Sequence, residues 1–200
     1  MYYEHMKGID VRQQIIKAAE VLFRQQGYGK TSMTRIARDC GLSNTNLYRY
    51  FNSKKDIGAE LVYQYLATRE QELELIIANK GMTAAEKLES FVLYILNHTY
   101  HHTDSQLKLS ELIDMMVIQR PEVIRAHRQI NLRLLHDVLL LGQQSGEFTF
   151  DDVEEMAQTI NTVITAFYLP IIMVIYPLSE LEQRAISVCN MILASLSAKS

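Results

Sequence analysis

Residues 27–54 read GYGKTSMTRIARDCGLSNTNLYRYFNSK, and a single turn in this stretch separates two short helical patterns. The first pattern repeats apolar side chains at positions 33, 36, 37 and 40, the spacing of one face of an α-helix. Thr31 and Ser32 offer N-cap hydroxyls to this first pattern,. Gly41 follows where the turn needs a residue that tolerates positive φ, and Ser43 offers an N-cap hydroxyl to the second pattern. The stretch therefore predicts a helix-turn-helix.

Polar side chains gather at the start of the second of these helices, the end that enters the major groove of DNA in such motifs. Asn44, Thr45 and Asn46 stand there, and their amide and hydroxyl groups can read base edges. Aromatic and basic side chains suited to phosphate oxygens follow: Tyr48, Arg49, Tyr50, Lys54 and Lys55. An ordinary helical hairpin would show a similar spacing, with Asn44 and Thr45 only starting a helix and the tyrosines filling the core. Both interpretations stay open at this point.

Helical periodicity continues outward from this stretch in both directions. A first helix is predicted from about residue 9 to residue 26, and a fourth from Ser53 toward Asn79, with Ser53 and Asp56 spaced as a capping pair,. Later helix starts are indicated by cap residues, or by a proline suited to a first turn: Thr83 paired with Glu86, Asp104 or Ser105, Pro121, Asp151 with Asp152, and Ser179 paired with Glu182. Pro170 predicts a kink or a break in the helix that follows Asp152. The expected fold class is all-α, with a helical bundle behind the helix-turn-helix.

Composition supports a helical globular chain. Of the 200 residues, 48% are hydrophobic and 22% charged, and only 8 Gly and 3 Pro occur, which argues against a disordered chain and against a turn-rich all-β fold. The longest apolar stretch, residues 163–178, is too short to span a membrane. The first ten residues lack the basic and apolar regions of an export signal. Two distant cysteines, Cys40 and Cys189, favour reduced thiols in a cytoplasmic protein.

Charge is unevenly distributed along the chain. The net formal charge is −3. Residues 1–56 hold ten Lys or Arg against five Asp or Glu, a net +5, and residues 57–200 therefore carry −8. A basic N-terminal part favours a polyanionic partner. Chance segregation would give the same numbers, so charge alone does not establish DNA as that partner.

The residues that carry the helix-turn-helix resemble the N-terminal domain of the TetR-type transcriptional regulators. The similarity lies in Gly27–Tyr28, Thr31–Ala37, Gly41–Ser43 and Leu47–Lys54, within about residues 9–60. It implies a homodimeric, all-helical repressor, with a DNA-binding domain in residues 1–56 and a ligand-binding and dimerisation domain in residues 57–200. The function so implied is a ligand-responsive regulator that binds a palindromic double-stranded DNA operator as a dimer, and that a small, largely apolar effector releases.

The resemblance also assigns DNA contacts position by position. It places four side chains near phosphates: Ser32, Tyr48, Tyr50 and Lys54. It places others near bases: Thr34 or Arg35, together with Asn44, Thr45 and Asn46. Tyr50 stands where the family commonly has histidine.

The end of the chain shows more apolar surface than an isolated domain needs. One apolar stripe suffices for a helix on the surface of a domain, but the last predicted helix carries two, and residues 160–176 are apolar nearly all round. Two such helices from each subunit would form a four-helix interface, so we expect a homodimer through the last two helices. The alternative is a fully buried core helix.

Large and semi-polar side chains in the central helices suggest an effector pocket, since small-molecule sites are mostly apolar with a few polar groups. The candidates are Phe91, Tyr94, His98, Met116, Phe167, Tyr168 and Met173. Each of them could equally be core filling. An anionic effector would require an arginine inside the pocket, and Arg128 or Arg133 could supply one.

Catalytic and metal-binding motifs are missing from the sequence. A phosphate-binding glycine loop, GxSxG and HExxH do not occur, so no enzyme, no cofactor and no catalytic residue are expected. His98 and His102 are four residues apart, but no acidic or cysteine partner has a recognisable ligand spacing, so no metal is expected either. Two alternatives remain: a helical binding module without DNA affinity, and an all-α enzyme that uses His98 or His136 as a base. A salt-sensitive DNA complex would exclude the first, and turnover lost in His98→Ala would support the second.

Overall fold

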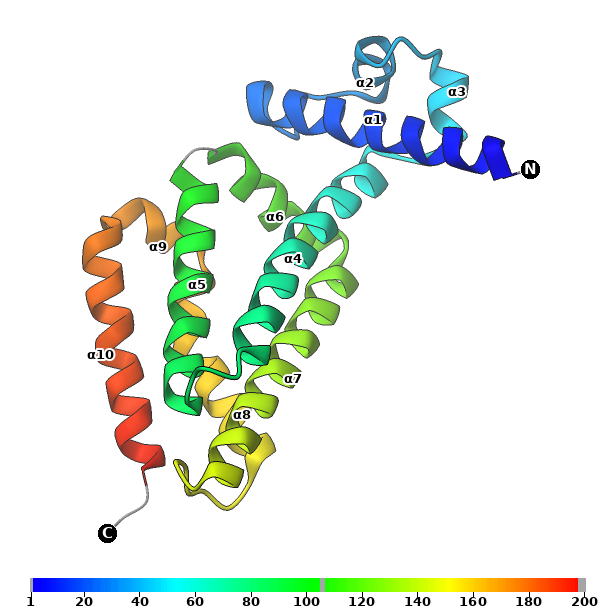
Figure 1. The fold of residues 1–200 in the computed structure, drawn as a ribbon. Coiled ribbons are helices and arrows are strands. Elements are labelled where there is room, and N and C mark those ends of the chain that lie inside the picture. The colour runs from blue at the N-terminus through cyan, green and yellow to red at the C-terminus, as the bar shows by residue number, and fades with distance from the viewer. Residues whose placement is uncertain (1, 105–106, 198–200) are drawn as a thin grey trace. The chain divides into compact units, whose positions relative to one another are not determined.

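The computed structural model describes residues 2–104 and 107–197, and side chains within 11–102 and 111–197. The described residues form helices and no strands (Figure 1), which confirms the all-α prediction. The helices are α1 (Tyr2–Gln26), α2 (Met33–Asp39), α3 (Asn44–Tyr48), α4 (Lys54–Ala78), α5 (Ala84–Asp104), α6 (Leu107–Gln119), α7 (Pro121–Ser145), α8 (Val153–Val163), the 3-10 helix η1 (Ile164–Tyr168), α9 (Pro170–Ile175) and α10 (Leu178–Leu196).

The chain packs as two compact units. The first contains residues 1–66 and 106–124, and the second contains residues 67–105 and 125–200. The sequence-based boundary after residue 56 divides the chain by expected function rather than by packing, and it stays a prediction. No helix among the described residues is long and apolar enough to cross a bilayer.

The first unit is built around α1. Buried side chains of α1, including Ile15 and Phe23, share a core with Ile36 of α2 and Leu47 of α3. Local capping starts the short helices, as the sequence predicted: Ser32 Oγ accepts from Arg35 N, and Ser43 Oγ accepts from Asn46 N, each at 3.2 Å. The turn between them has Gly41 at φ +67°, a conformation that favours glycine.

The start of α4 completes this unit. Ser53 and Asp56 form the predicted capping pair, with Asp56 N donating to Ser53 Oγ at 3.2 Å. One turn later, Gly58 faces two neighbours so closely that a Cβ would lie 3.0 Å from Leu112 Cδ1 and 3.1 Å from Tyr28 Cε2. The glycine therefore lets α6 and the loop before α2 pack directly on α4.

The second unit has α5 at its centre, packed on α10, α9 and η1, and Figure 1 shows α10 alongside α5. The predicted capping pair opens α5, with Glu86 N donating to Thr83 Oγ1 at 3.1 Å and Thr83 N donating to Glu86 Oε2 at 2.8 Å. The core beneath contains Phe91 of α5, Leu135 of α7 and Cys189 of α10.

Several predicted helix boundaries need correction. The first helix begins at Tyr2, earlier than residue 9. The predicted cap at Ser179 is wrong, because α10 already begins at Leu178 after Pro177 and has no side-chain cap. Pro170 breaks the preceding helix as predicted: α8 ends at Val163, η1 follows, and the proline opens α9. Of the two residues predicted to start the next helix, Asp104 is the last residue of α5, and Ser105 lies outside the described residues.

Candidate nucleic-acid interface and effector site

Helices α2 and α3 form the helix-turn-helix, and the start of α3 presents polar side chains to solvent. Asn44 and Thr45 are exposed, and Asn46 is half-buried. Asn44 Nδ2 donates to Thr34 Oγ1 at 3.1 Å, which joins the start of α3 to α2. The structure thus brings together the predicted base-reading residues of both helices.

The side chains predicted to contact DNA differ in their exposure and in the contacts that they make within the protein. Ser32 and Tyr48 are exposed, although the Ser32 hydroxyl also caps α2. Tyr50 is half-buried against the core of the first unit, as the core-filling alternative expected. Arg35 is exposed and its Nε donates to Asp39 Oδ1 at 3.1 Å, within α2.

Lys54 has a structural role that the sequence did not indicate. Its Nζ donates to Tyr28 O at 2.7 Å, to Thr31 O at 2.8 Å and to Gly29 O at 3.4 Å, and it lies 4.4 Å from the centre of the Tyr28 ring. Desolvation lowers the pKa of the ammonium. Lys54 therefore holds the loop that precedes α2, and its contact with phosphate stays a prediction.

Six of the seven predicted effector residues belong to the second unit. Phe91, Phe167 and Met173 are buried in its core. Tyr94, His98 and Tyr168 are half-buried there. The seventh, Met116, is buried in the core of the first unit, beside Gly58.

A group of polar side chains lies inside the second unit, and we name it the Arg69 cluster: Arg69 and Glu70 of α4, His127 and Asn131 of α7, and Tyr168 of η1. Arg69 is only 4% exposed. His127 Nδ1 lies 2.6 Å from Glu70 Oε1. Because the carboxylate accepts the Nδ1 proton, Nε2 of the neutral ring is an acceptor. Arg69 Nη2 donates to this nitrogen, and so does Asn131 Nδ2 at 3.1 Å.

Burial shifts the pKa values of ionisable groups in and near this cluster. Desolvation lowers the pKa of His127, and the charge of Arg69 lowers it further, against the opposing effect of Glu70. Desolvation also raises the pKa of the Tyr168 hydroxyl. Nearby, desolvation lowers the pKa of His98 to about 3, with His102 and Arg69 adding to the shift. The pKa values of His98 and His127 therefore lie below their usual range, and both rings are neutral at pH 7.

The Tyr168 hydroxyl oxygen and Asn131 Oδ1 are buried without a hydrogen-bond partner among the described residues. The Tyr168 ring lies 5.8 Å from Arg69 Cζ. The sequence identified Tyr168 as a candidate but not Arg69. The sequence feature that points to burial of Arg69 is its position between Leu66 and Leu73 on the apolar face of α4. Arg128 and Arg133, the two arginines considered from sequence, are both exposed.

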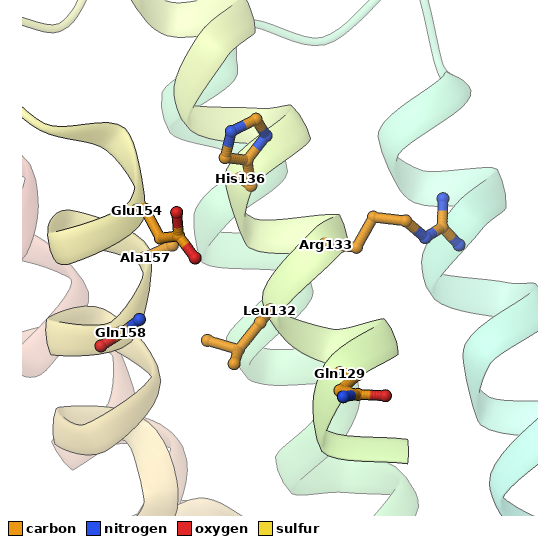
Figure 2. A pocket seen from close by; sticks show the side chains of 7 residues that line it. All are labelled: Gln129, Leu132, Arg133, His136, Glu154, Ala157 and Gln158. Atoms are coloured by element: carbon orange, nitrogen blue, oxygen red, sulfur yellow. The ribbon is translucent and has the colours of Figure 1, made fainter. Parts of the chain in front are cut away.

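A separate groove of about 360 Å³ lies between α7 and α8. It is lined by Gln129, Leu132, Arg133, His136, Glu154, Ala157 and Gln158 (Figure 2). Arg133 reaches away from α8, and its Nη2 binds Glu74 Oε1 at 2.7 Å. None of the predicted effector residues lines this groove.

Possible metal ligands do not gather in threes anywhere in the described part of the chain. The rings of His98 and His102, the pair considered from sequence, stack with their centres 4.3 Å apart. Both cysteines are free thiols.

The fold and the exposed start of α3 define a helix-turn-helix DNA-binding protein. The family model for bacterial regulatory proteins of the tetR family matches residues 15–61, and the model for the tetracyclin repressor-like C-terminal domain matches residues 84–189. The chain belongs to the TetR family of transcriptional regulators.

Individual relatives agree with this assignment. The fatty acid metabolism regulator protein of Bacillus subtilis (strain 168) is 30% identical over 140 residues, which cover 67% of this chain and 69% of the relative. The crystal structure of FadR from Bacillus subtilis in complex with stearoyl-CoA has a TM-score of 0.65 and 26% identity, covering 92% of this chain and 98% of that one. A TetR/AcrR-family regulator from Thermobifida fusca YX-ER1 shares the fold, with a TM-score of 0.69, 21% identity, and coverage of 92% and 97%.

Proposed function

We propose that this protein is a dimeric repressor that binds a palindromic DNA operator and is released by a small, largely apolar effector. The observation that carries the DNA-binding part is the polar start of α3, where the exposed Asn44 and Thr45 adjoin Thr34 of α2. A helix end of this kind inserts into the major groove in helix-turn-helix proteins, where amides recognise bases.

Apolar side chains on the last two helices support dimerisation. Ile171, Val174 and Ile175 of α9 are exposed, as are Ile186 and Met191 of α10. Exposed apolar side chains that gather in one patch mark protein–protein interaction sites. On α10, Ile186 and Met191 lie outside the core of the second unit, whereas Val188 and Leu193 pack against it.

The core of the second unit supports an effector with an apolar body. Phe91, Phe167 and Met173 belong to it, and the FadR relatives from Bacillus subtilis and Thermus thermophilus carry stearoyl-CoA and lauroyl-CoA in their structures. Release from DNA requires the effector to bind one conformation of the dimer more tightly than the other.

The proposal is tested by selecting duplexes from a random pool and measuring retention by wild-type protein across salt concentrations. We expect a palindromic site whose affinity falls steeply with salt. Asn44→Ala is expected to cost about 1–3 kcal/mol on that site and little on a scrambled duplex. Gln144→Ala, an exposed amide at the end of α7, serves as the matched control. If no duplex is retained in a salt-dependent way, the proposal is wrong.

A further inference from the structure

We propose that Asn44 recognises an adenine in each half of the DNA operator, and that Thr34 is the residue that positions the Asn44 amide for this base. The inference rests on the proposed function, because it assumes that α3 enters the major groove. It goes further by naming the base that is read. It also gives Thr34, which the family resemblance places near bases, the task of orienting a neighbouring side chain.

The first step concerns the hydrogen bond between the two side chains. Asn44 Nδ2 donates to Thr34 Oγ1 at 3.1 Å. An asparagine amide has two N–H donors and one carbonyl acceptor, so this bond uses one donor. Asn44 is exposed, and its Oδ1 atom and second N–H group remain available on the amide. The side chain therefore offers one acceptor and one donor next to each other.

The second step concerns how firmly Thr34 and Asn44 are held relative to each other. Helices α2 and α3 belong to the same compact unit, and Ile36 and Leu47, one from each helix, are fully buried in its core. In the turn between the helices, Leu42 N donates to Ala37 O at 2.8 Å. Because both backbones are fixed in this way, Thr34 gives the Asn44 amide an acceptor at a constant place.

The third step concerns the cost of ordering a side chain on DNA. An exposed amide without such a neighbour samples several orientations, and DNA binding would have to select one of them at a loss of entropy. The hydrogen bond to Thr34 restricts the Asn44 amide before DNA is bound. Part of the entropic cost is thereby removed from the binding step.

The fourth step identifies the base. In the major groove, adenine presents the N6 amino group as a donor and N7 as an acceptor, which match Oδ1 and one N–H of asparagine. Guanine presents two acceptors, N7 and O6, so Oδ1 of Asn44 would meet an acceptor there. An amide with both N–H groups free could turn to offer donors to guanine. Since Thr34 occupies one of these groups, it favours adenine over guanine.

The test is a selection of duplexes from a random pool by the full-length protein, followed by sequencing of the retained DNA. We expect one position in each half-site where wild type prefers adenine over guanine by about tenfold or more, the usual discrimination of a bidentate pair. Asn44→Ala should lose the preference at that position and keep the preferences at the others.

Substitutions of Thr34 separate positioning from a structural role. Thr34→Val keeps the shape of an exposed side chain and removes its hydroxyl, so the melting temperature should stay near that of wild type. The preference for adenine over guanine at the Asn44 position is expected to fall about fivefold, as for the loss of one hydrogen bond. Thr34→Ser keeps the hydroxyl and should restore the preference. Thr149→Val, at an exposed threonine of the second unit, is the matched control and should select the wild-type site.

A double variant tests whether Thr34 acts through Asn44. Thr34→Val is added to Asn44→Ala, and the base preferences of the double variant are compared with those of Asn44→Ala alone. We expect no further change, because the side chain that Thr34 orients is already absent. A further change at any position would mean that Thr34 contacts DNA itself, and would overturn the positioning role.

Other results would also overturn the inference. They are a base other than adenine at the position that depends on Asn44, base preferences unchanged in Thr34→Val, weaker binding by Thr34→Val that is uniform over all positions, and no recovery in Thr34→Ser. Each of these leaves a salt-dependent complex with a palindromic site intact. If wild type retains no duplex in a salt-dependent way, the proposed function itself is overturned.

Discussion

At the scale of single residues, Lys54 stabilises the N-terminal unit through backbone carbonyls. Lys54→Ala removes the donor for Tyr28 O and Thr31 O and is expected to lower the free energy of unfolding by about 1–3 kcal/mol, the usual cost of leaving such groups unpaired. Urea unfolding followed by circular dichroism measures this. The Lys54→Ala variant should bind every DNA sequence more weakly by a similar factor. The reason is that the loop held by Lys54 precedes α2, and that the sequence also predicts a contact between Lys54 and phosphate.

The neighbouring Lys55→Ala supplies the comparison for this variant. It removes the same charge from the same helix end without removing the carbonyl contacts of Lys54. If the two variants unfold at the same urea concentration, the loop-holding role of Lys54 is refuted, and only its charge matters.

Single residues also show what sequence can and cannot predict. The caps at Ser32 and Ser43 were predictable because a cap bonds to a backbone group only three residues away,. Arg69 and His127 are 58 positions apart, and no local pattern specifies such a pairing. Arg69 is buried because α4 packs on α7, a fact that belongs to tertiary structure.

At the scale of elements, the end of α7 depends on a glycine. A Cβ at Gly142 would lie 2.0 Å from Phe148 Cδ2, and Phe148 N donates to Gly142 O at 3.0 Å. Gly142→Ala is therefore expected to displace the ring and to destabilise the protein by about 1–3 kcal/mol or more. The melting temperature measures this effect.

Gly29→Ala is the control for this substitution. Its Cβ would meet only an ordinary contact, 3.7 Å from Glu111 Oε1, so its melting temperature should stay near that of wild type. Equal melting temperatures for wild type and Gly142→Ala would show that the Phe148 ring moves aside without cost.

Helix α5 contributes the half-buried His98 and α7 the buried His127, and in both the folded protein disfavours the protonated form. The pKa of His98 is lowered to about 3 and that of His127 is also lowered. Below about pH 6.5 the unfolded chain binds protons that the folded protein does not, so stability falls as pH falls, with a slope of at most about 1.4 kcal/mol per pH unit for each histidine. Urea unfolding between pH 7.5 and pH 5 measures this slope.

His98→Phe keeps an aromatic ring on α5 but removes the titrating group. Its stability is expected to depend less on pH than that of wild type over the same interval. An identical slope in the variant would mean that His98 is as free to ionise in the folded protein as in the unfolded chain.

The boundaries of elements were predictable where covalent structure dictates them. Pro170 cannot continue a helical hydrogen-bond pattern, and it stands at the first position of α9, after η1 has ended at Tyr168. The predicted cap at Ser179 is wrong because Pro177, with φ −68° and ψ 152°, occupies the N-cap position and α10 begins at Leu178. Glu182, its predicted partner, instead accepts from Asn97 Nδ2 at 3.1 Å and joins α10 to α5.

At the scale of the whole molecule, dimerisation should decide whether the protein holds its operator. Ile186 of α10 is 39% exposed in the single chain, so a glutamate there is compatible with folding. At the proposed interface, however, it would bury a lone carboxylate. Ile186→Glu is therefore expected to shift the protein from dimer to monomer in sedimentation velocity at micromolar concentration. Affinity for the palindrome should fall with it, since one DNA-binding unit makes half the phosphate contacts.

The choice of residue and control makes this experiment specific to the interface. Leu193 lies on the same helix but is half-buried against its own core, so Leu193→Glu would also disturb the fold of the single chain. Leu75→Glu places the same charge on α4, where the side chain is 65% exposed, and it should remain dimeric. A wild-type monomer at micromolar concentration, or a dimer that persists in Ile186→Glu, would contradict an interface through α10.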